Sequence, residues 1–409
     1  MRWYMRNPNL NITPIPGHRA IGKLGPAPAV AKAKTQTLRR LATQIEGKRH
    51  KMAFLILVFV ILSVISGAFA APSCLDESGR AVDSWVALKE ANGWNYYYMS
   101  GRTWTKSSNS LSQGKNGMIM KTAQQAYGTG IMMGMYNDEL ASASVSASKA
   151  HAKGILVSDA KQGYWLVHSM PKWPAPATSS RVTGPGPFDS DKYAQSLMCV
   201  TVSAKTADTI ASNLMVENVN LTGQKTASFS SSFPNFTKWL GGGKLDTPTS
   251  TTQIKSLGGA TFFQFAKSSG WGKDLWDDLV APFFKTPLYA ETWRNGVGGR
   301  FGSVCSPPTG PKKQTYNVLA VATVKMPDGT SWSGTDDHSK WVVSSTPAAS
   351  LFCVGGINRM CSQEKRGGGA LCAQTSGGYT AFSKIVGSTE KCWAYNPCEG
   401  SAKDKCYWC

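Results

Sequence analysis

Two short segments of the chain each place a histidine two residues before a lysine. The first reads "AHAKGILV" and contains His151 and Lys153; the second reads "DHSKWVV" and contains His338 and Lys340. Residues i and i+2 of a strand point to the same face, so each segment would present an imidazole beside an ammonium group. An imidazole can act as a nucleophile or a general acid near neutral pH, and an ammonium group can neutralise a phosphoryl oxygen. The two segments are therefore suited to attack on a phosphodiester without a metal ion.

The distribution of the histidines favours a functional role for these segments. A single His-x-Lys is common and usually lies on a solvated strand edge. The chain has five histidines, and His18 and His50 precede the N-terminal apolar segment. The other three, His151, His168 and His338, all lie in the two segments or in the strand that follows the first. Purely structural histidines would be expected to scatter.

Similar elements surround the two segments. In each, an apolar run, a turn-rich stretch and a second apolar run predict strand, turn and strand; the runs are Gly154–Val157, Tyr164–Val167, Trp341–Val343 and Leu351–Val354. The units end at His168 and at Gly355, each 17 residues after its histidine. We interpret this as a weak internal duplication. Two such units meeting across a pseudo-twofold axis would place the imidazoles on opposite sides of one phosphorus atom, where one attacks and the other protonates the leaving oxygen.

A stretch rich in Gly, Pro, Ser and Thr at residues 241–255 has no apolar period and predicts a linker. It leaves halves at 71–240 and 256–386, and each half contains one His-x-Lys. The other predicted elements are a strand at Asn317–Lys325 and helices at Ala207–Met215 and Phe262–Val280. The predicted fold class is mixed α and β.

The N-terminal region has the composition of a targeting signal. Residues 1–51 hold 11 Lys+Arg and one Glu, so about half of the net charge of +20 lies there. Residues 52–70 form a short apolar run ending in small residues, which is typical of a signal peptide cleaved near Ala70 or Ala71. We expect the mature protein to lack the basic leader; the alternative is a signal anchor with a basic cytosolic tail. The remaining charge of about +10 favours a polyanionic partner.

All ten cysteines follow this signal, and an even count in an exported chain predicts disulfides. Asn220 and Asn235 begin Asn-x-Thr glycosylation sequons, which are usable only in the secretory route. Residues 387–409 form a Cys-rich tail that ends in Cys-Tyr-Trp-Cys. That spacing suits a redox or zinc pair, but a disulfide-stapled tail is favoured in an exported chain.

Other site chemistries find no support in the sequence. It contains no P-loop, no Rossmann fingerprint and no His-Glu-x-x-His cluster. The glycines of "RGGGALC", Arg366–Cys372, lack the Lys-Ser/Thr of a phosphate-binding loop and predict a tight turn. We therefore expect no cofactor and no metal.

The same segments resemble the deoxyribonuclease II family, the metal-independent acid endonucleases of animals. The matching stretches are "HAKGILVSDAKQGYWLVHSMPKWP", "DDHSKW", "CVGGINR", "RGGGALCAQ", "YNDE", "FFQFAKSSGWGKDLWDD" and "CLDESGRAVDSW". These stretches match the family in order along the chain, and together they span Cys74 to Val386, nearly all of the expected mature chain. Their combination is specific, although no single stretch is.

The resemblance implies a phospholipase D-like fold, a pseudo-dimer of two similar halves that share one active site. It implies cleavage of duplex DNA at acid pH to 3′-phosphate and 5′-hydroxyl ends through a phosphohistidine intermediate. The implied site residues are His151 and His338 as nucleophile and general acid in either order, Lys153 and Lys340 as phosphate ligands, His168 as a third histidine, and Asn358 as an orienting group.

Two positions depart from the patterns that the resemblance brings. The phospholipase D motif has an acidic residue seven positions after each histidine, where this chain has Ser158 and Ser345. The family often has a cysteine at the position of Val342, bonded to the counterpart of Cys353. Without it we expect Cys353 to pair with a new partner. The expected disulfides are Cys353–Cys361, by proximity, and Cys74–Cys199 and Cys305–Cys372, as in the family.

The sequence thus predicts an exported, acid-active, metal-independent endodeoxyribonuclease whose partner is DNA, with no stable membrane association. Secretion and delivery to the lysosome begin with the same kind of signal. The main alternative is an inactive secreted relative that binds DNA or a host surface, and the complete set of histidines and lysines argues against it. A phosphodiesterase or phospholipase of the wider superfamily is disfavoured by the deoxyribonuclease-specific stretches.

Overall fold

A computed structural model describes the fold of most of the chain. The described residues are 71–113, 116–139, 148–175, 191–293, 295, 301–306 and 315–392, and all of them belong to the compact unit Ala70–Cys409. The predicted leader, the signal peptide and most of the Cys-rich tail lie outside the described residues.

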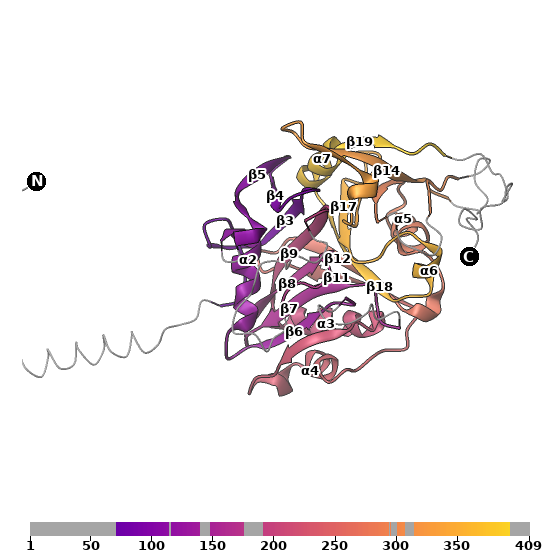
Figure 1. The fold of residues 1–409 in the computed structure, drawn as a ribbon. Coiled ribbons are helices and arrows are strands. Elements are labelled where there is room, and N and C mark those ends of the chain that lie inside the picture. The colour runs from indigo at the N-terminus through magenta and orange to yellow at the C-terminus, as the bar shows by residue number, and fades with distance from the viewer. Residues whose placement is uncertain are drawn as a thin grey trace, which may run out of the picture. The chain divides into compact units, whose positions relative to one another are not determined.

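Strands from the first predicted half form one large sheet (Figure 1). Its order is β10-β6-β7-β8-β9-β3-β4-β5. The strands are β3 (Ser84–Lys89), β4 (Asn95–Ser100), β5 (Thr103–Ser110), β6 (Met132–Tyr136), β7 (Lys153–Ser158), β8 (Gln162–His168), β9 (Gln195–Ser203) and β10 (Leu221–Lys225). The short strands β1 (Cys74–Leu75) and β2 (Ala81–Val82) pair separately.

Strands from the second half form the other large sheet, in the order β11-β12-β18-β17-β16-β13-β14-β15, with β19 paired to β14. These strands are β11 (Thr249–Lys255), β12 (Thr261–Lys267), β13 (Leu288–Glu291), β14 (Val318–Lys325), β15 (Ser331–Ser333), β16 (Trp341–Ser344), β17 (Leu351–Gly355), β18 (Gly368–Gln374) and β19 (Val386–Thr389). The mixed class and the two predicted strand–turn–strand units, β7–β8 and β16–β17, are confirmed, as is the predicted strand that became β14.

The two sheets share most of a strand order. The run β6-β7-β8-β9 in the first sheet corresponds to β13-β16-β17-β18 in the second, each run is extended by a strand from earlier in the chain, β3 or β12, and all of these neighbours are antiparallel. The next strands differ, since β4 follows β3 in the chain whereas β11 precedes β12. Helices flank both runs in the same way. Helices α2 (Gly117–Gln124) and α5 (Ala281–Phe284) precede β6 and β13, whereas α3 (Ala204–Glu217) and α7 (Ser376–Lys384) follow β9 and β18.

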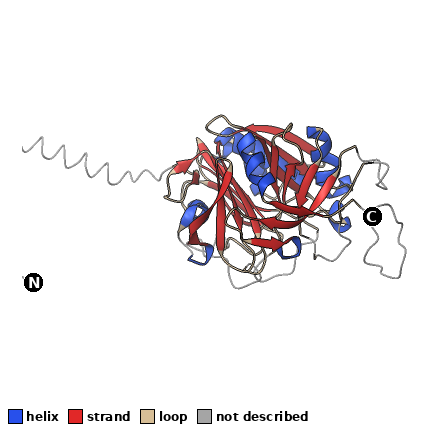
Figure 2. Ribbon diagram, turned by 90° about the horizontal axis from the view of Figure 1, so that it is seen from above, coloured by secondary structure: helices blue, strands red, loops and turns tan. Residues whose placement is uncertain are grey.

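The central strands are apolar because both of their faces are covered. Residues of β7, β8 and β9 are buried along almost their whole length, so these strands read as continuous apolar runs instead of alternating patterns. Helix α3 packs against β8 and β12, and α7 packs against β17 and β5, so each helix contacts both sheets. Figure 2 shows helices, in blue, packed against the strands, in red. One hydrophobic cluster accordingly runs through both sheets and includes Trp165, Leu214 and Val354.

Helix α3 confirms the predicted helix at Ala207–Met215 and shows why its ends lie where they do. The Ser203 hydroxyl accepts a hydrogen bond from the Thr206 backbone N–H at 3.1 Å and satisfies a free donor of the first turn. At the other end Asn218 adopts a left-handed conformation, which ends the helix.

Three predicted elements were wrong. The expected linker 241–255 contains β11, a strand paired along its full length with β12, so the turn-rich composition reflects an edge strand. The expected helix Phe262–Val280 begins with β12, and only the short helix from Trp276 continues into α5. The expected turn Arg366–Cys372 is the start of β18, whose glycines lie between two neighbouring strands.

The disulfides correct two of the three predicted pairings. Cys74–Cys199 forms as expected. Cys353 bonds Cys372 instead of Cys361, because the two lie directly opposite each other on β17 and β18. Cys305 bonds Cys392, which follows β19 beside β14. Cys361 is also disulfide-bonded, to none of these partners.

The described residues contain no helix that is both long and apolar enough to cross a membrane. The two predicted sequons lie at partly buried positions. The Asn220 side chain donates to the Asn137 carbonyl at 2.9 Å, and the Asn235 side chain donates to the Asp208 carboxylate at 2.8 Å. Glycosylation at either site stays a prediction.

Candidate active site

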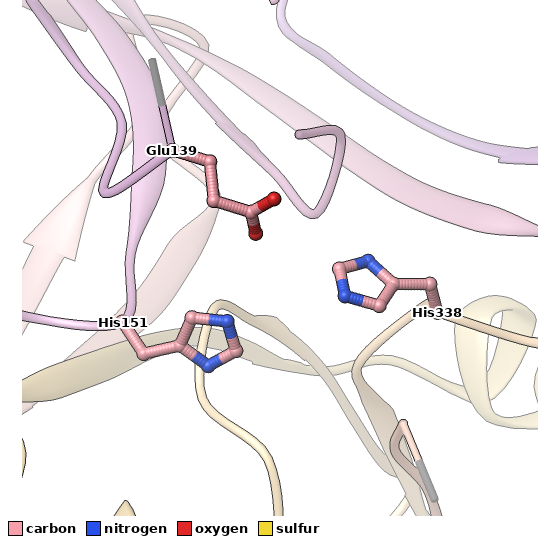
Figure 3. A group of neighbouring side chains, drawn as sticks. All are labelled: Glu139, His151 and His338. Carbon is pink, nitrogen blue, oxygen red and sulfur yellow. The ribbon is translucent and has the colours of Figure 1, made fainter. Parts of the chain in front are cut away.

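The fold brings the two His-x-Lys segments together. His151 and Lys153 lie at the start of β7, and His338 and Lys340 lie just before β16. The imidazole ring centroids are 6.5 Å apart, with ring planes at 74°. Figure 3 shows both imidazoles turned toward one shared space, each with its Nε2 side facing that space. All four side chains are buried, with at most 8% of any residue exposed.

Each histidine segment is anchored to the opposite sheet. The His151 backbone N–H donates to the Gly367 carbonyl at 2.9 Å, one residue before β18. The His338 backbone N–H donates to the Ala194 carbonyl at the same distance, one residue before β9. Because β9 and β18 occupy equivalent places in the two sheets, the two anchors are equivalent as well. This exchange of backbone bonds sets the spacing of the two imidazoles.

Gly356 permits the close approach of the second sheet to His151. A Cβ at this position would lie 2.8 Å from the His151 carbonyl oxygen and 2.8 Å from the Ala152 Cα, closer than side-chain atoms pack. Only glycine therefore fits where the loop after β17 passes the first histidine. The glycine pair of "CVGGINR" has a structural reason that belongs to the site.

Two acidic residues that the sequence reasoning did not select as site residues complete the first half of the site. Asp138 and Glu139 follow β6 after a single residue, Asn137, and the apolar run before them was the signal that could have found them. Lys153 forms ion pairs with both carboxylates, and its Nζ lies 3.3 Å from Glu139 Oε1. Arg366 also binds Asp138, at 2.9 Å. Asp138 is fully buried, so these cations compensate a carboxylate that has no access to water.

Lys340 has a different environment from Lys153. Its Nζ donates to the His338 carbonyl at 2.6 Å and lies 3.2 Å from the His338 Nδ1. Among the described residues it forms no ion pair. Burial, and next the charge of Lys153, lower the pKa of Lys340 well below its usual value. A phosphate group would supply the negative charge that this buried lysine lacks.

The two facing histidines both have a lowered pKa. Burial, followed by the nearby Lys153 and Lys340, lowers the pKa of His151 well below its usual value. Burial, Lys340 and Lys153 lower the pKa of His338 in the same way, and Asp138 partly opposes them. For Lys153, burial alone would lower the pKa, but Asp138 and Glu139 raise it above the usual value. In the free protein the site therefore holds a charged lysine and two neutral imidazoles.

His168 lies beside Lys153 because the two residues are paired across β7 and β8. Its Nδ1 accepts a hydrogen bond from the Met170 backbone N–H at 3.2 Å, and its ring lies 5.0 Å from that of Trp173. Burial, with a smaller effect of Lys153, lowers its pKa to about 3. His168 is thus a neutral neighbour of Lys153.

Asn358 lies in the loop that follows Gly356. Its side-chain nitrogen contacts the Met360 sulfur at 3.9 Å, and its buried Oδ1 has no hydrogen-bond partner among the described residues. The neighbouring Arg359 fixes this loop through a two-point ion pair with Asp277, with the closer contact at 2.9 Å. The aromatic ring of Trp293, which the sequence did not indicate, lies 5.0 Å from the His338 ring.

Donor atoms of Glu139, His151 and His338 all lie within 4.8 Å of one another, which is close enough for one metal ion to reach all three (Figure 3). The charges around them oppose a cation. Lys153 already neutralises Glu139, and Lys340 lies against His338. The arrangement of two lysines around two imidazoles suits an anion better than a cation.

Comparison with known proteins gives one consistent result. The family model described as Deoxyribonuclease II matches residues 73–392. Cell death-related nuclease 6 of Caenorhabditis elegans is 31% identical over 82% of this chain and 93% of its own length. Plancitoxin-1 of Acanthaster planci is 32% identical over 81% and 96%, and deoxyribonuclease-2-beta of Rattus norvegicus is 30% identical over 83% and 98%.

Proposed function

The chain belongs to the deoxyribonuclease II family and is a nuclease of that type, and from this premise we propose that it is a metal-independent acid endodeoxyribonuclease. The proposal rests mainly on one observation. Two imidazoles face a common space between two buried lysines, and the four residues come from equivalent positions in the corresponding runs β6-β7-β8-β9 and β13-β16-β17-β18 of the two sheets.

We propose a two-step displacement at phosphorus. In the first step the Nε2 of one neutral imidazole attacks the phosphorus, a P–N bond forms, and the bond to the 5′-oxygen breaks. The second imidazole, protonated, gives its proton to that leaving oxygen and releases a 5′-hydroxyl end. The negative charge that develops on the phosphoryl oxygens would be stabilised by the lysines.

In the second step water replaces the histidine. The second imidazole, now neutral, takes a proton from the attacking water, the P–N bond breaks, and a 3′-phosphate end is released. The phosphohistidine exists only between the two steps. His151 and His338 carry these roles in either order, and Lys153 and Lys340 bind the phosphate oxygens.

Two further residues support this site in the proposal. His168 stays neutral beside Lys153 and would donate from its Nε2 toward that side of the site. Asn358 has an unpartnered buried oxygen, and it would orient water or the leaving group once DNA is bound. The four-strand run common to both sheets supports a phospholipase D-like arrangement, in which each half contributes one His-x-Lys to a single site.

The proposal includes an exported location. Cys74–Cys199, Cys305–Cys392 and Cys353–Cys372 are disulfide-bonded, and such bonds persist in oxidising compartments. Secretion and lysosomal delivery are both consistent with these disulfides, and activity at acid pH would suit the lysosome. We propose that the Asn220 and Asn235 sequons are used along this route.

A plasmid-nicking assay at about pH 5 with and without EDTA tests the chemistry. The wild-type protein should nick at the same rate in both conditions, because the lysines supply the positive charge. Loss of nicking in EDTA with recovery in magnesium would contradict the proposal and favour a metal held by Glu139 and the two histidines. Absence of nicking in every condition, with DNA binding retained, would favour the inactive relative.

Single and double histidine variants test the shared site. His151→Ala and His338→Ala should each lower the rate by several orders of magnitude, and the double variant should be only slightly slower, because the residues act as one unit. DNA binding should survive in all three, since backbone electrostatics dominate the affinity. A single variant with near wild-type nicking would show that the two histidines do not share one site.

A further inference from the structure

The reacting side of His338 is its Nε2, which faces the shared space, but its other nitrogen has partners as well. The Nδ1 lies 3.2 Å from the Ser169 carbonyl oxygen and 3.3 Å from the side-chain oxygen of Gln195. Ser169 follows β8 and Gln195 begins β9. Both partners therefore come from the first sheet, whereas His338 belongs to the segment that enters the second.

Gln195 is held in this orientation by a chain of hydrogen bonds. The Ser169 hydroxyl donates to its side-chain oxygen at 2.6 Å, and the same hydroxyl accepts from the Ser196 backbone N–H at 2.9 Å. Gln195 is 1% exposed, so water does not compete for its oxygen. Its side-chain nitrogen has no partner among the described residues, so the contacts of this amide are on its oxygen side.

The chemistry of these partners decides which nitrogen of neutral His338 carries the proton. A backbone carbonyl oxygen can only accept, so the Nδ1 facing it must donate. Lys340 Nζ also lies 3.2 Å from this nitrogen, but two oxygen acceptors face it, and a lone pair on Nδ1 would be turned toward both of them. The proton therefore resides on Nδ1, and the lone pair of Nε2 faces the site.

We propose that Gln195 is a positioning residue, which with the Ser169 carbonyl holds the Nδ1–H of His338 and so directs its Nε2 lone pair at the phosphorus or at the proton to be moved. This inference rests on the proposed function of His338. It assigns to Gln195 the task that an acidic residue seven positions after the histidine would have, where this chain has Ser345.

A neutral amide differs from a carboxylate in its effect on His338. A carboxylate would favour the protonated ring, whereas the amide fixes the tautomer without adding charge. The other charged and titratable groups facing His338 are Lys340, Lys153, His151, Asp138 and Glu139. With an amide at position 195, burial, followed by the charges of Lys340 and Lys153, lowers the pKa of His338 and keeps the ring neutral in the free protein.

Nitrogen-15 NMR of histidine-labelled protein tests the tautomer without relying on activity. The His338 signals, assigned by their loss in His338→Ala, should show the Nδ1–H form in the wild-type protein near neutral pH. In Gln195→Met, which keeps the side-chain length but removes the acceptor, the Nε2–H form should gain population. A wild-type His338 with its proton on Nε2 would overturn the inference, even if the protein proves to be an active nuclease.

Kinetics then show what the contact does in the reaction. Gln195→Met should lower kcat roughly ten- to a hundred-fold, the usual cost of removing the outer partner of a functional histidine, with little change in KM. Gln195→Glu should move one limb of the pH–rate profile to higher pH, because a carboxylate near Nδ1 favours the charged ring. A shift of the acid limb identifies His338 as the nucleophile, and a shift of the alkaline limb identifies it as the general acid.

Gln253→Glu is the matched control, since it adds the same charge on the exposed face of the edge strand β11. Its profile should match that of the wild-type protein. If Gln195→Glu leaves both limbs in place, or if Gln253→Glu moves them equally, Gln195 has no specific role at His338. Such a result with normal wild-type nicking would reject this inference and leave the proposed function standing.

Discussion

At the scale of single residues, the buried imidazoles and lysines of the site disfavour positive charge on one another. Burial disfavours charge on His151 and His338, and two lysines add to that effect. The neutral form that attack requires is therefore stable in the free protein, whereas the protonated form that the general acid requires is not. A bound phosphate reverses the balance for one ring, since its negative charge favours the imidazolium.

The lowered histidine pKa values predict an acid optimum. As pH falls from about 7 to about 5, the fraction of protein with a protonated general acid grows, and the rate should rise. At still lower pH the nucleophile becomes protonated and the rate should fall again. Nicking rates measured across this range give the profile, and a rate that increased steadily toward alkaline pH would contradict the assignment.

His168 predicts that stability changes with pH in the opposite direction to activity. Its pKa is about 3 in the folded protein and lies near 6.5 when unfolded, so the unfolded chain binds the extra proton between these values. The stabilisation is fully present above about pH 6.5 and is lost as pH falls toward about 3. Thermal unfolding of the wild-type protein should show a falling Tm from about pH 7 to about pH 5, and His168→Gln should flatten this slope, even if its Tm is lower throughout. Equal slopes in both proteins would rule out this role.

At the scale of elements, the loop after β17 and the segment before β7 are fitted to each other. Gly356 lies where any side chain would meet the His151 backbone, and Arg359 fixes the same loop through Asp277. The first imidazole is thus positioned as much by the second sheet as by its own strand.

Gly356→Ala should damage catalysis more than stability. The new methyl group has to displace the His151 carbonyl or the loop, so the imidazole moves, and shifts of about 1 Å can cost roughly a hundred-fold in rate. Nicking at acid pH and thermal unfolding measure the two effects. Gly270→Ala is the control, because its nearest neighbouring atom is 3.9 Å from the new Cβ. Wild-type nicking by Gly356→Ala would show that this contact does not position His151.

At the scale of the whole described unit, the two similar sheets are joined by helices that contact both of them and by backbone hydrogen bonds between them. Helices α3 and α7 each contact both sheets, and each histidine segment takes its backbone hydrogen bond from the other sheet. Two disulfides tie parts of the second sheet, since Cys353–Cys372 joins the neighbouring strands β17 and β18 and Cys305–Cys392 joins the segment before β14 to the segment after β19.

Peptide mapping of the non-reduced protein should recover Cys353 linked to Cys372 and Cys305 linked to Cys392. The double variant Cys353→Ser with Cys372→Ser should lose about 2–4 kcal/mol of stability and keep measurable nicking, because neither cysteine contacts the imidazoles. A Cys353–Cys361 peptide would instead restore the pairing expected from proximity in sequence.

The sequence by itself determined the chemical groups of the candidate site and the local units that carry them. Because i and i+2 residues share a strand face, and because both histidines are followed by similar strand–turn–strand patterns, the duplication was visible without a structure. The long apolar runs also predicted β7, β8, β16 and β17, because a strand that is covered on both faces is apolar along its whole length. The family resemblance rested on these segments, and the comparisons agree with it.

Only the tertiary structure decided what depends on contacts between distant segments. The turn-rich composition of 241–255 and the glycines of 366–372 predicted a linker and a turn, but pairing with neighbouring strands made them β11 and the start of β18. Cys353 pairs with Cys372 because of strand register, which spacing along the chain does not encode. Asp138 and Glu139 reach the imidazoles from the segment after β6, and Gln195 reaches His338 from β9, 143 residues away in sequence. Burial, which lowers the pKa values of His151 and His338, exists only once both sheets enclose the site.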